Sequence, residues 1–255
     1  MIRDEVRGHT AVITIDNPPA NTWTPESLDA LAGLLARLEA NPAIRAAVLV
    51  GAGGKFFSAG ADLKRFQGDK VFARHFIARF AAAFDALRAS RFVTIAAING
   101  YAMGGGLECT LACDIRIAEA QAHMALPECA VGLLPGGSGT QLLPWLVGEG
   151  WAKRMILTNE RVDAATAERI GLVQQVVAQG EGLAAALAMA ERVATLSPRA
   201  VSSCKGLIHN ARSGVPLAAG LALERERFMD LFDHADQAEG VAAFLEKRKP
   251  EWKND

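Results

Sequence analysis

The feature that most restricts the fold of this chain is an alternation of short apolar runs with longer helical patterns over about its first 145 residues. The runs at 46–50 and 95–98 contain only Ala, Val, Leu and Ile, and they end at Gly51 and Asn99. Short runs without polar alternation are typical of strands that are buried on both faces of a parallel sheet. A helical pattern over roughly 70–89 separates them. This order predicts an α/β fold.

Further elements are predicted on both sides of this region. A β-hairpin is indicated by residues 2–7 and 10–16, which are rich in β-branched residues. Thr24 followed by Pro25 is typical of a helix start. A helix is expected at about 107–112, strands at 115–117 and 124–127, a short strand at 172–177, and helices at 149–157, 163–170, 182–196, 198–212, 216–232 and 235–248. We expect a boundary near Ser197-Pro198, with a core over 1–195 and a helical region over 196–255.

Composition limits the classes of partner. The 255 residues are 51% hydrophobic and 22% charged, which is enough apolar material for a large core. A net charge of −1 argues against nucleic acid as the main partner, because polyanion binding usually requires a basic surplus. The four cysteines form no CxxC pair, which fits a reducing cytoplasm. Since there is neither a signal-peptide pattern nor an apolar run of ~20 residues, we expect a cytoplasmic protein without a membrane partner.

Several familiar motifs fail on spacing. The segment GAGGK at 51–55 matches neither the phosphate-binding GxxxxGK[ST] pattern nor the dinucleotide-binding GxGxxG pattern. The segment GGSG at 136–139 lacks the glycine placement of a GxSxG nucleophile elbow. The five histidines are scattered and form no HExxH motif. Neither metal chemistry nor a serine triad is therefore indicated.

Two loops of small residues remain as candidates. Residues 58–61 have side chains small enough for a ligand to approach main-chain N–H groups, although a tight turn into a helix explains them equally well. Residues 104–106 are three glycines between a buried strand and an apolar helix. Their N–H groups would lie at the positive end of the helix dipole, where negative charge is stabilised. Because three glycines weaken a helix start, a functional role is favoured for this loop.

Two glutamates stand in apolar surroundings. Glu108 follows the three glycines inside an apolar helical pattern, and Glu128 lies within the apolar segment 125–133. A buried carboxylate is costly unless it is hydrogen-bonded or functional. One such group is often structural. Two of them, one beside a candidate oxyanion-binding loop, favour general acid–base chemistry on a water molecule.

Taken together, these segments resemble the enoyl-CoA hydratases of the crotonase (enoyl-CoA hydratase/isomerase) superfamily. The shared motifs cover nearly the whole chain and are FSAGADLK (57–64), AAINGYAMGGGLE (96–108), CDIRIA (113–118), LPECAVGLLPGGSGTQ (126–141), LTNERVDAATAERIGLV (157–173) and FLEKRKPEWK (244–253). The resemblance implies a crotonase-type spiral of ββα units, a helical C-terminal region used in oligomerisation, and trimers that pair into hexamers. The second glutamate, found in hydratases but not in many of their relatives, favours hydration.

The resemblance also implies a role for each site residue. The N–H groups of Ala61 and Gly105 would form an oxyanion hole for the thioester carbonyl. Glu108 and Glu128 would hold one water molecule, with Glu108 activating it and Glu128 donating a proton to C2. The acyl-CoA thioester would be bound by Lys55, Ala59, Ala61, Asp62, Leu63, Lys64, Gly105 and Gly136. The implied reaction converts a trans-2-enoyl-CoA to a 3-hydroxyacyl-CoA, as in fatty acid β-oxidation. No metal or redox cofactor is implied, because coenzyme A is part of the substrate.

The chain departs from the family pattern at three places. Leu142 stands where an arginine is common, which affects the expected subunit contacts, and Leu126 stands where some short-chain hydratases have glutamine. Asn21-Thr22-Trp23 differs from the usual NALN-type segment. The last two departures leave the preferred acyl chain length open. The competing functions are an enoyl-CoA isomerase, which moves the double bond with one carboxylate, a nucleic-acid-binding relative and a catalytically silent subunit.

Overall fold

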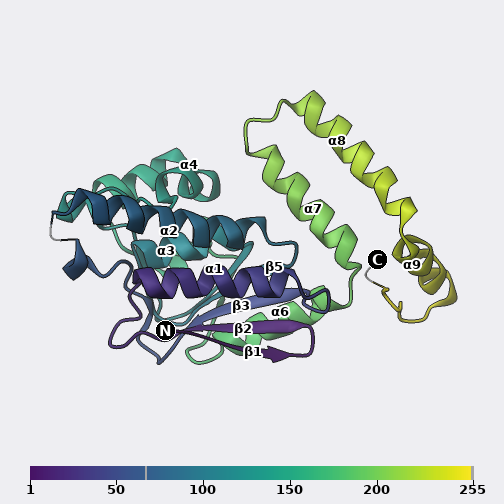
Figure 1. Cartoon of the computed structure of the whole chain (residues 1–255), viewed down its shortest axis with the longest axis horizontal. Helices are drawn as coiled ribbons and strands as arrows, with labels where there is room; N and C mark the ends of the chain where they lie inside the picture. The colour runs from purple at the N-terminus through teal and green to yellow at the C-terminus, as the bar shows by residue number, and fades with distance from the viewer. Residues whose placement is uncertain (67, 254–255) are drawn as a thin grey trace.

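The strands form two sheets, and the chain repeats the same order of strands and helix as it passes from one to the other (Figure 1). The structure is a computed structural model and describes residues 1–66 and 68–253. The larger sheet contains, in spatial order, β1 (Ile2–Arg7), β2 (Thr10–Ile15), β3 (Ala46–Gly51), β5 (Val93–Ile98), β7 (Ile115–Glu119) and β10 (Gln175–Val177). The smaller sheet contains β4 (Phe56–Ser58), β6 (Tyr101–Met103), β8 (His123–Ala125) and β9 (Val162–Asp163).

Each turn of the spiral adds one strand to each sheet and then a helix. The turns are β3-β4-α2 (Lys70–Ala89), β5-β6-α3 (Gly105–Ala112) and β7-β8-α4 (Gly139–Leu157). Neighbouring strands from β2 to β10 in the larger sheet are parallel, and β1 pairs antiparallel with β2 as the predicted hairpin. The predicted α/β spiral of ββα units is therefore confirmed.

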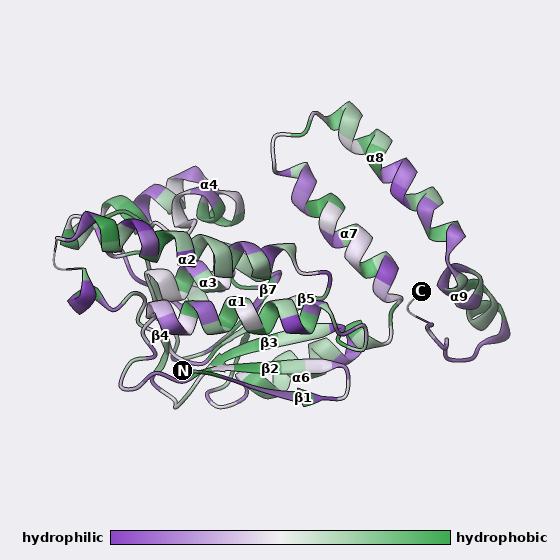
Figure 2. Cartoon of the chain, in the orientation of Figure 1, coloured by the Kyte–Doolittle hydropathy of each residue, from purple (hydrophilic) through white to green (hydrophobic). Residues whose placement is uncertain are grey.

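Both faces of the larger sheet are covered, which explains its continuous apolar runs. Every residue of β3 and β5 is buried, and Figure 2 shows hydrophobic β2 and β3 beside a hydrophilic edge strand β1. Alternate residues of β3 belong to different cores. Ala47 and Leu49 pack with α1 (Pro25–Glu39) and α2, whereas Val48 packs with α6 (Gly182–Ala194).

The predicted helix start at Thr24 is confirmed. The Thr24 hydroxyl accepts a hydrogen bond from the Ser27 N–H (3.2 Å), and the Ser27 hydroxyl accepts one from the Thr24 N–H (2.9 Å). This reciprocal capping box satisfies two N–H groups that a helix end would otherwise leave free. Pro25 occupies the first helical position, where no N–H is needed.

The predicted helix at 149–157 is too short. Helix α4 begins ten residues earlier, at Gly139, and it bends at Gly148, where φ is +77°. Pro144 lies inside it and is tolerated because Leu142 and Leu143 are buried, so packing overrides the local preference for a break. Short helix α5 (Ala164–Arg169) follows. Helix α3 also begins two residues earlier than expected, and the strand predicted at 172–177 is confined to β10.

The helices after Ser197 lie to one side of the spiral (Figure 1). They are α7 (Pro198–Ala211), α8 (Leu217–Asp230) and α9 (Ala235–Glu246). None of the residues of α7 or α8 is buried. Large apolar side chains on all three helices are exposed, among them Ile208 (67%), Phe228 (60%) and Phe244 (83%). The described part of the chain leaves these faces uncovered.

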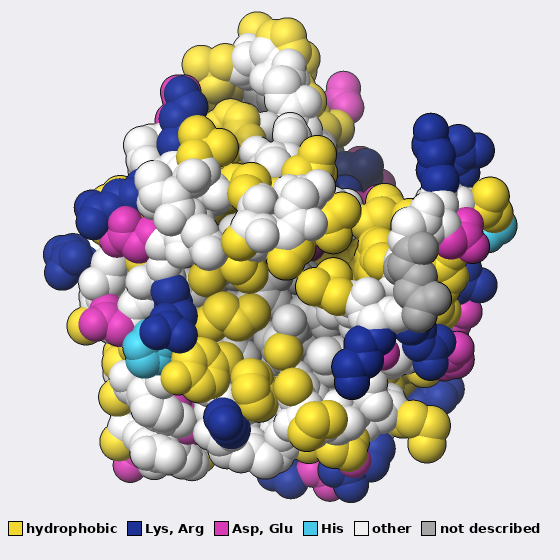
Figure 3. Space-filling model, turned by 90° about the vertical axis from the view of Figure 1, so that its left-hand side faces the viewer, with side chains coloured by type: hydrophobic (Ala, Val, Ile, Leu, Met, Phe, Trp, Pro, Cys, Tyr) yellow, Lys and Arg dark blue, Asp and Glu magenta, His cyan; other side chains and the backbone are white. Residues whose placement is uncertain are grey.

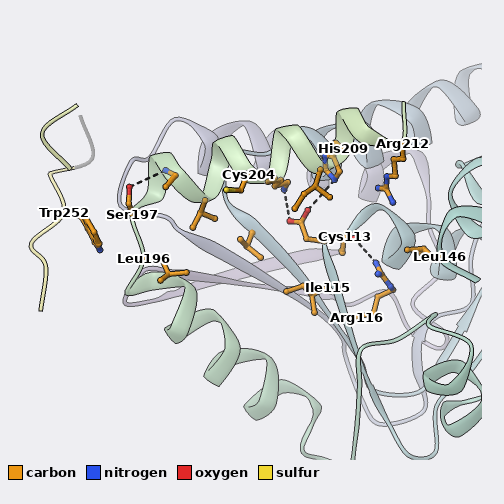
Figure 4. Close-up of a pocket in the computed structure, with 16 residues that line it drawn as sticks. Cys113, Ile115, Arg116, Leu146, Leu196, Ser197, Cys204, His209, Arg212 and Trp252 are labelled. Carbon is orange, nitrogen blue, oxygen red and sulfur yellow. Dashed lines mark hydrogen bonds and ion pairs between the residues drawn. The ribbon is translucent and has the colours of Figure 1, made fainter. Parts of the chain in front are cut away.

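A cavity of about 690 Å³ separates α7 from the larger sheet (Figure 4). An ion pair anchors α7 across it, since the Lys205 ammonium lies 2.8 Å from the Asp114 carboxylate and both side chains are largely buried. Asp114 also accepts hydrogen bonds from the N–H and the hydroxyl of Thr94. Between residues 1 and 253, Gln67 aside, no helix is both long and apolar enough to cross a membrane.

Candidate active site

A second cavity, of about 510 Å³, lies between α2, the N-terminal end of α3 and the short 3-10 helices η1 (Leu63–Arg65) and η2 (Glu128–Val131). Most of its wall is apolar and includes Phe66, Ile77 and Phe80, whose place in a cavity the sequence does not reveal. Leu63 and Leu134 are exposed at its mouth (48% and 66%). Figure 3 shows the face that carries η1 and the start of α2, where apolar side chains gather around a hollow. A ligand with an apolar chain fits such a site.

Glu108 reaches this cavity from α3 and is 2% exposed. Its Oε1 atom accepts hydrogen bonds from the N–H groups of Gly137 and Gly139, both at 2.8 Å. Burial raises the pKa of Glu108, the N–H donors of Gly139 and Gly137 lower it, and the nearby Glu128 carboxyl raises it, which together give a pKa of about 7. The carboxyl group therefore exchanges its proton near neutral pH.

The segment GGSG, which matches no nucleophile elbow, is thus the support of Glu108. A Cβ atom on Gly137 would lie 2.8 Å from Oε2 of Glu108, and one on Gly139 would lie 3.1 Å from Oε1. Glycine at both positions lets the backbone approach the carboxylate closely. The spacing of the glycines is visible in the sequence, but their role as the support of Glu108 could not be predicted from it, because Glu108 is distant in the chain.

Glu128 enters the same cavity as the first residue of η2. Burial raises its pKa, and its Oε2 atom has no hydrogen-bond partner among the residues that the structure describes. A Cβ atom on Gly104 would lie 2.7 Å from Oε1 of Glu128, so this glycine makes room for the carboxyl group. The apolar residues beside Glu128 do not form core, because Val131 (56%) and Leu133 (42%) are exposed. The apolar character of this segment therefore reflects the cavity wall and its mouth as well as the core.

Two unused backbone donors face the cavity beside the carboxyl groups. Ala61 and Gly105 both line it, and neither N–H donates to another residue in the described part of the chain. Gly105 is the first residue of α3, where the N–H has no acceptor within the helix and the dipole is positive. Together with Glu108 and Glu128, they provide two donors and two carboxyl groups around one apolar space.

The predicted substrate-binding residues separate into two groups. Ala59, Ala61, Leu63, Gly105 and Gly136 line the cavity together with both glutamates. Lys55, Asp62 and Lys64 do not belong to its wall.

The two lysines and Asp62 lie outside that wall in different settings. Both lysines are exposed, and the Lys55 ammonium lies 5.4 Å from the centre of the Phe56 ring. Asp62 caps η1 by accepting a hydrogen bond from the Lys64 N–H (3.3 Å), and it lies 3.8 Å from Arg65. Asp62 therefore has a structural partner, whereas the two lysines offer positive charge outside the cavity.

Outside this cavity, titratable side chains also meet under α7, where Asp114 pairs with Lys205. Within residues 1–66 and 68–253, no group of three or more His, Cys, Asp or Glu side chains is arranged to hold a metal ion. All four cysteines are free thiols, and Cys109 and Cys113 are buried as small apolar residues.

The model of the enoyl-CoA hydratase/isomerase family matches residues 5–255 of this sequence. The chain belongs to this family. Its structure is similar to that of Pseudomonas aeruginosa DspI, with a TM-score of 0.97 and 62% identity over 99% of this chain and 96% of that one. An enoyl-CoA hydratase from Bacillus anthracis gives a TM-score of 0.96 at 36% identity, over 100% and 99% of the two chains. The short-chain-enoyl-CoA hydratase of Clostridium acetobutylicum is 37% identical over 97% of this chain and 95% of its own.

Proposed function

We propose that this crotonase-family enzyme adds water to a trans-2-enoyl-CoA thioester and forms a 3-hydroxyacyl-CoA. The observation that carries the proposal is the meeting of two carboxyl groups and two unused backbone donors in one apolar cavity. Hydration needs both kinds of group. The hydroxyl of water bonds to C3, a proton bonds to C2, and negative charge moves onto the thioester oxygen in between.

The donors suit the charge that develops during the reaction. The N–H groups of Ala61 and Gly105 would bind the thioester oxygen, and they bind it more strongly as it becomes an enolate. Low polarity around the cavity strengthens these bonds. An interaction that strengthens in the transition state accelerates the chemical step.

The two carboxyl groups suit the protons that move. Burial raises the pKa of both carboxyl groups, so both bind a proton more readily than an exposed glutamate does. The two N–H bonds to Glu108 lower its pKa against the effect of burial, so the ionised form, which activates water, becomes available near neutral pH. Glu128, whose Oε2 has no protein partner among the described residues, would donate the proton to C2.

The charge distribution around the cavity suits the two ends of the substrate. The acyl chain would lie against the apolar wall from α2, beside Gly136. The exposed ammonium groups of Lys55 and Lys64 would contact the phosphates of coenzyme A outside the cavity. We propose fatty acid β-oxidation, or a reaction sequence with the same thioester chemistry, as the setting of this reaction.

Isomerisation of a 3-enoyl-CoA is the second candidate, because the same oxyanion donors would stabilise its dienolate. It requires one carboxylate to carry a proton between two carbon atoms and makes no use of a second. Glu128 lies in the cavity, and its Oε2 atom has no hydrogen-bond partner within residues 1–66 and 68–253, which favours hydration. The intact pair also argues against a silent subunit, and the net charge of −1 argues against a nucleic-acid-binding role.

We also propose that residues 196–255 mediate association into trimers, or hexamers made from two trimers. The uncovered apolar side chains of α7, α8 and α9 support this, since a monomer rarely exposes so much apolar surface in one region. Light scattering coupled to gel filtration would measure the mass of the assembly directly.

Glutamine variants of the two carboxyl groups test the proposed reaction. Glu108→Gln and Glu128→Gln should each lower the rate of crotonyl-CoA hydration by several orders of magnitude, because both groups are needed to aim one water molecule. The double variant should be little worse than either single variant, since groups that act as a unit are not additive. Glu160→Gln, which alters a surface carboxylate paired with Arg154, is the control and should keep full activity.

Parallel assays with a 3-enoyl-CoA distinguish hydratase from isomerase. An isomerase would convert this substrate rapidly in the wild type, retain most of that rate in one of the two glutamine variants and barely hydrate crotonyl-CoA. Hydration that survives in either single variant would remove that glutamate from the mechanism.

A further inference from the structure

Trp23 occupies a place that its position in the sequence does not reveal. Its side chain is fully buried, and the residue lies between β2 and α1. There it forms an isolated parallel bridge with Ala61. The Trp23 N–H donates to the Gly60 carbonyl (2.8 Å), and the Asp62 N–H donates to the Trp23 carbonyl (3.0 Å).

This bridge determines the direction of the Ala61 N–H. In a trans peptide the carbonyl and the N–H point in opposite directions. The carbonyl of Gly60 and the N–H of Ala61 share one peptide, and the carbonyl points toward Trp23. The Ala61 N–H therefore points away from Trp23, on the side where Ala61 lines the cavity.

The side chain of Trp23 contacts the segment that carries the second donor, the Gly105 N–H. The indole Nε1–H of Trp23 donates to the Gly105 carbonyl at 3.1 Å, across 82 residues of sequence. Gly105 opens α3, and the Gly104 carbonyl before it accepts the Glu108 N–H at 2.9 Å. The peptide before Gly105 is thus held by the helix through the Gly104 carbonyl. The peptide after it is held by the indole through the Gly105 carbonyl, in addition to the helix.

Packing leaves the indole little freedom to move. The Phe84 ring meets it edge to face, with centroids 5.8 Å apart, and Phe80 contacts Phe84 in the same way at 5.2 Å. A Cβ atom on Gly105 would lie 3.4 Å from Cδ1 of Trp23 and 2.7 Å from Cε1 of Phe80. The residue after Trp23 is Thr24, which caps α1. The ring is therefore enclosed, and its main chain is tied to a helix end.

From these contacts we infer that Trp23 is a positioning residue for catalysis, which fixes the separation and direction of the Ala61 and Gly105 N–H donors. This inference rests on the proposed function, because it assigns the support of the proposed oxyanion hole. Trp23 itself does not line the cavity and touches neither carboxyl group through a hydrogen bond in the described structure. Its effect should appear in the binding of negative charge on the thioester oxygen, not in the binding of coenzyme A.

Trp23→Phe tests this, because it keeps an aromatic ring and removes the N–H. The Gly105 carbonyl still accepts the helical hydrogen bond from the N–H four residues later, so the variant should fold. Loss of alignment at one donor should lower kcat for crotonyl-CoA roughly ten- to a hundred-fold, up to the effect of removing an oxyanion donor. KM should change by less than a factor of about three, because the contacts that bind the substrate equally in the ground state and in the transition state stay the same.

Two ligands provide a readout that a purely structural role would not move. Acetoacetyl-CoA can bind as an enolate with charge on its thioester oxygen, whereas butyryl-CoA cannot. Calorimetry should show that Trp23→Phe lowers the preference for acetoacetyl-CoA by the same factor as kcat and leaves the Kd of butyryl-CoA nearly unchanged. As a control, Phe92→Leu alters another buried aromatic residue and should lower Tm without changing the preference.

If Trp23→Phe does not fold, benzothienylalanine at position 23 serves instead, since it keeps the shape of tryptophan and replaces the N–H by sulfur. Full kcat and an unchanged ligand preference in either variant would overturn the positioning role. A wild type that neither hydrates crotonyl-CoA nor prefers acetoacetyl-CoA would instead refute the proposed function, so the two failures are distinguishable.

Discussion

Replacing Glu108 by glutamine tests how much the buried carboxyl group lowers the free energy of unfolding when it is ionised. In the unfolded chain this group loses its proton near its ordinary pKa of 4.5, whereas in the folded protein it keeps the proton up to about pH 7. Because the folded pKa is the higher one, the free energy of unfolding falls as pH rises through this window, and the loss is complete above pH 7. At about 1.4 kcal/mol per pH unit, the interval corresponds to about 3 kcal/mol.

Glutamine has nearly the same shape and carries no charge. Its carbonyl oxygen can accept the N–H groups of Gly137 and Gly139 in place of Oε1 of Glu108. Between about pH 5 and pH 8, Glu108→Gln should therefore become more stable relative to the wild type by about 2 to 3 kcal/mol, while it loses hydration activity. Urea unfolding followed by circular dichroism, at one protein concentration, measures the difference.

The surface variant Glu160→Gln again serves as the control and should show no such gain. A difference between Glu108→Gln and the wild type that stays constant from pH 5 to pH 8 would refute the reasoning. It would mean that the hydrogen bonds to Oε1 offset the burial of the charge, and that Glu108 ionises in the folded protein as it does in water.

Two further predictions concern charged side chains outside the cavity. Lys64→Ala should raise KM for an enoyl-CoA more than it lowers kcat, because a phosphate contact is equally strong in the ground state and in the transition state. The increase in KM should be smaller at high salt, and Lys153→Ala is the control. A fall in kcat at constant KM would contradict the assignment. Lys205→Met should destabilise the protein by roughly 3 to 5 kcal/mol in urea unfolding, because it leaves the buried Asp114 carboxylate without its partner. Adding Asp114→Asn should recover part of that loss, and no recovery would show that the ion pair is not its cause.

The sequence predicts most of the fold because local sequence patterns and tertiary packing favour the same helices and strands. Strands β3 and β5 are buried on both faces, so their apolar runs are uninterrupted, and the Thr24–Pro25 start of α1 is a local device that needs no tertiary partner. The failure at α4 has the opposite cause. Pro144 and Gly148 are signals for a break, and only the burial of neighbouring leucines explains why the helix includes them.

The candidate site is predictable in part for a similar reason. Glu108 and Glu128 are conspicuous in apolar segments whatever surrounds them. Their supports are not, because the Gly137 and Gly139 donors lie 29 and 31 residues from Glu108, and the indole of Trp23 lies 82 residues from Gly105. Apolar cavity walls also have the same composition as core, so the sequence does not distinguish Val131, which is exposed, from a buried residue.

The loop over residues 128–139 has a consequence for redesign of this enzyme. It begins with Glu128, continues through the apolar residues at the mouth of the cavity and ends with the two N–H groups that hold Glu108. Exchanging this loop to accept a different acyl chain would displace both carboxyl groups at once, so selectivity and rate would change together. Ala73 and Ile77 line the cavity from α2, a separate element that supplies neither carboxyl group. Changes in substrate range should therefore evolve, or be engineered, more readily on that helix than on the loop.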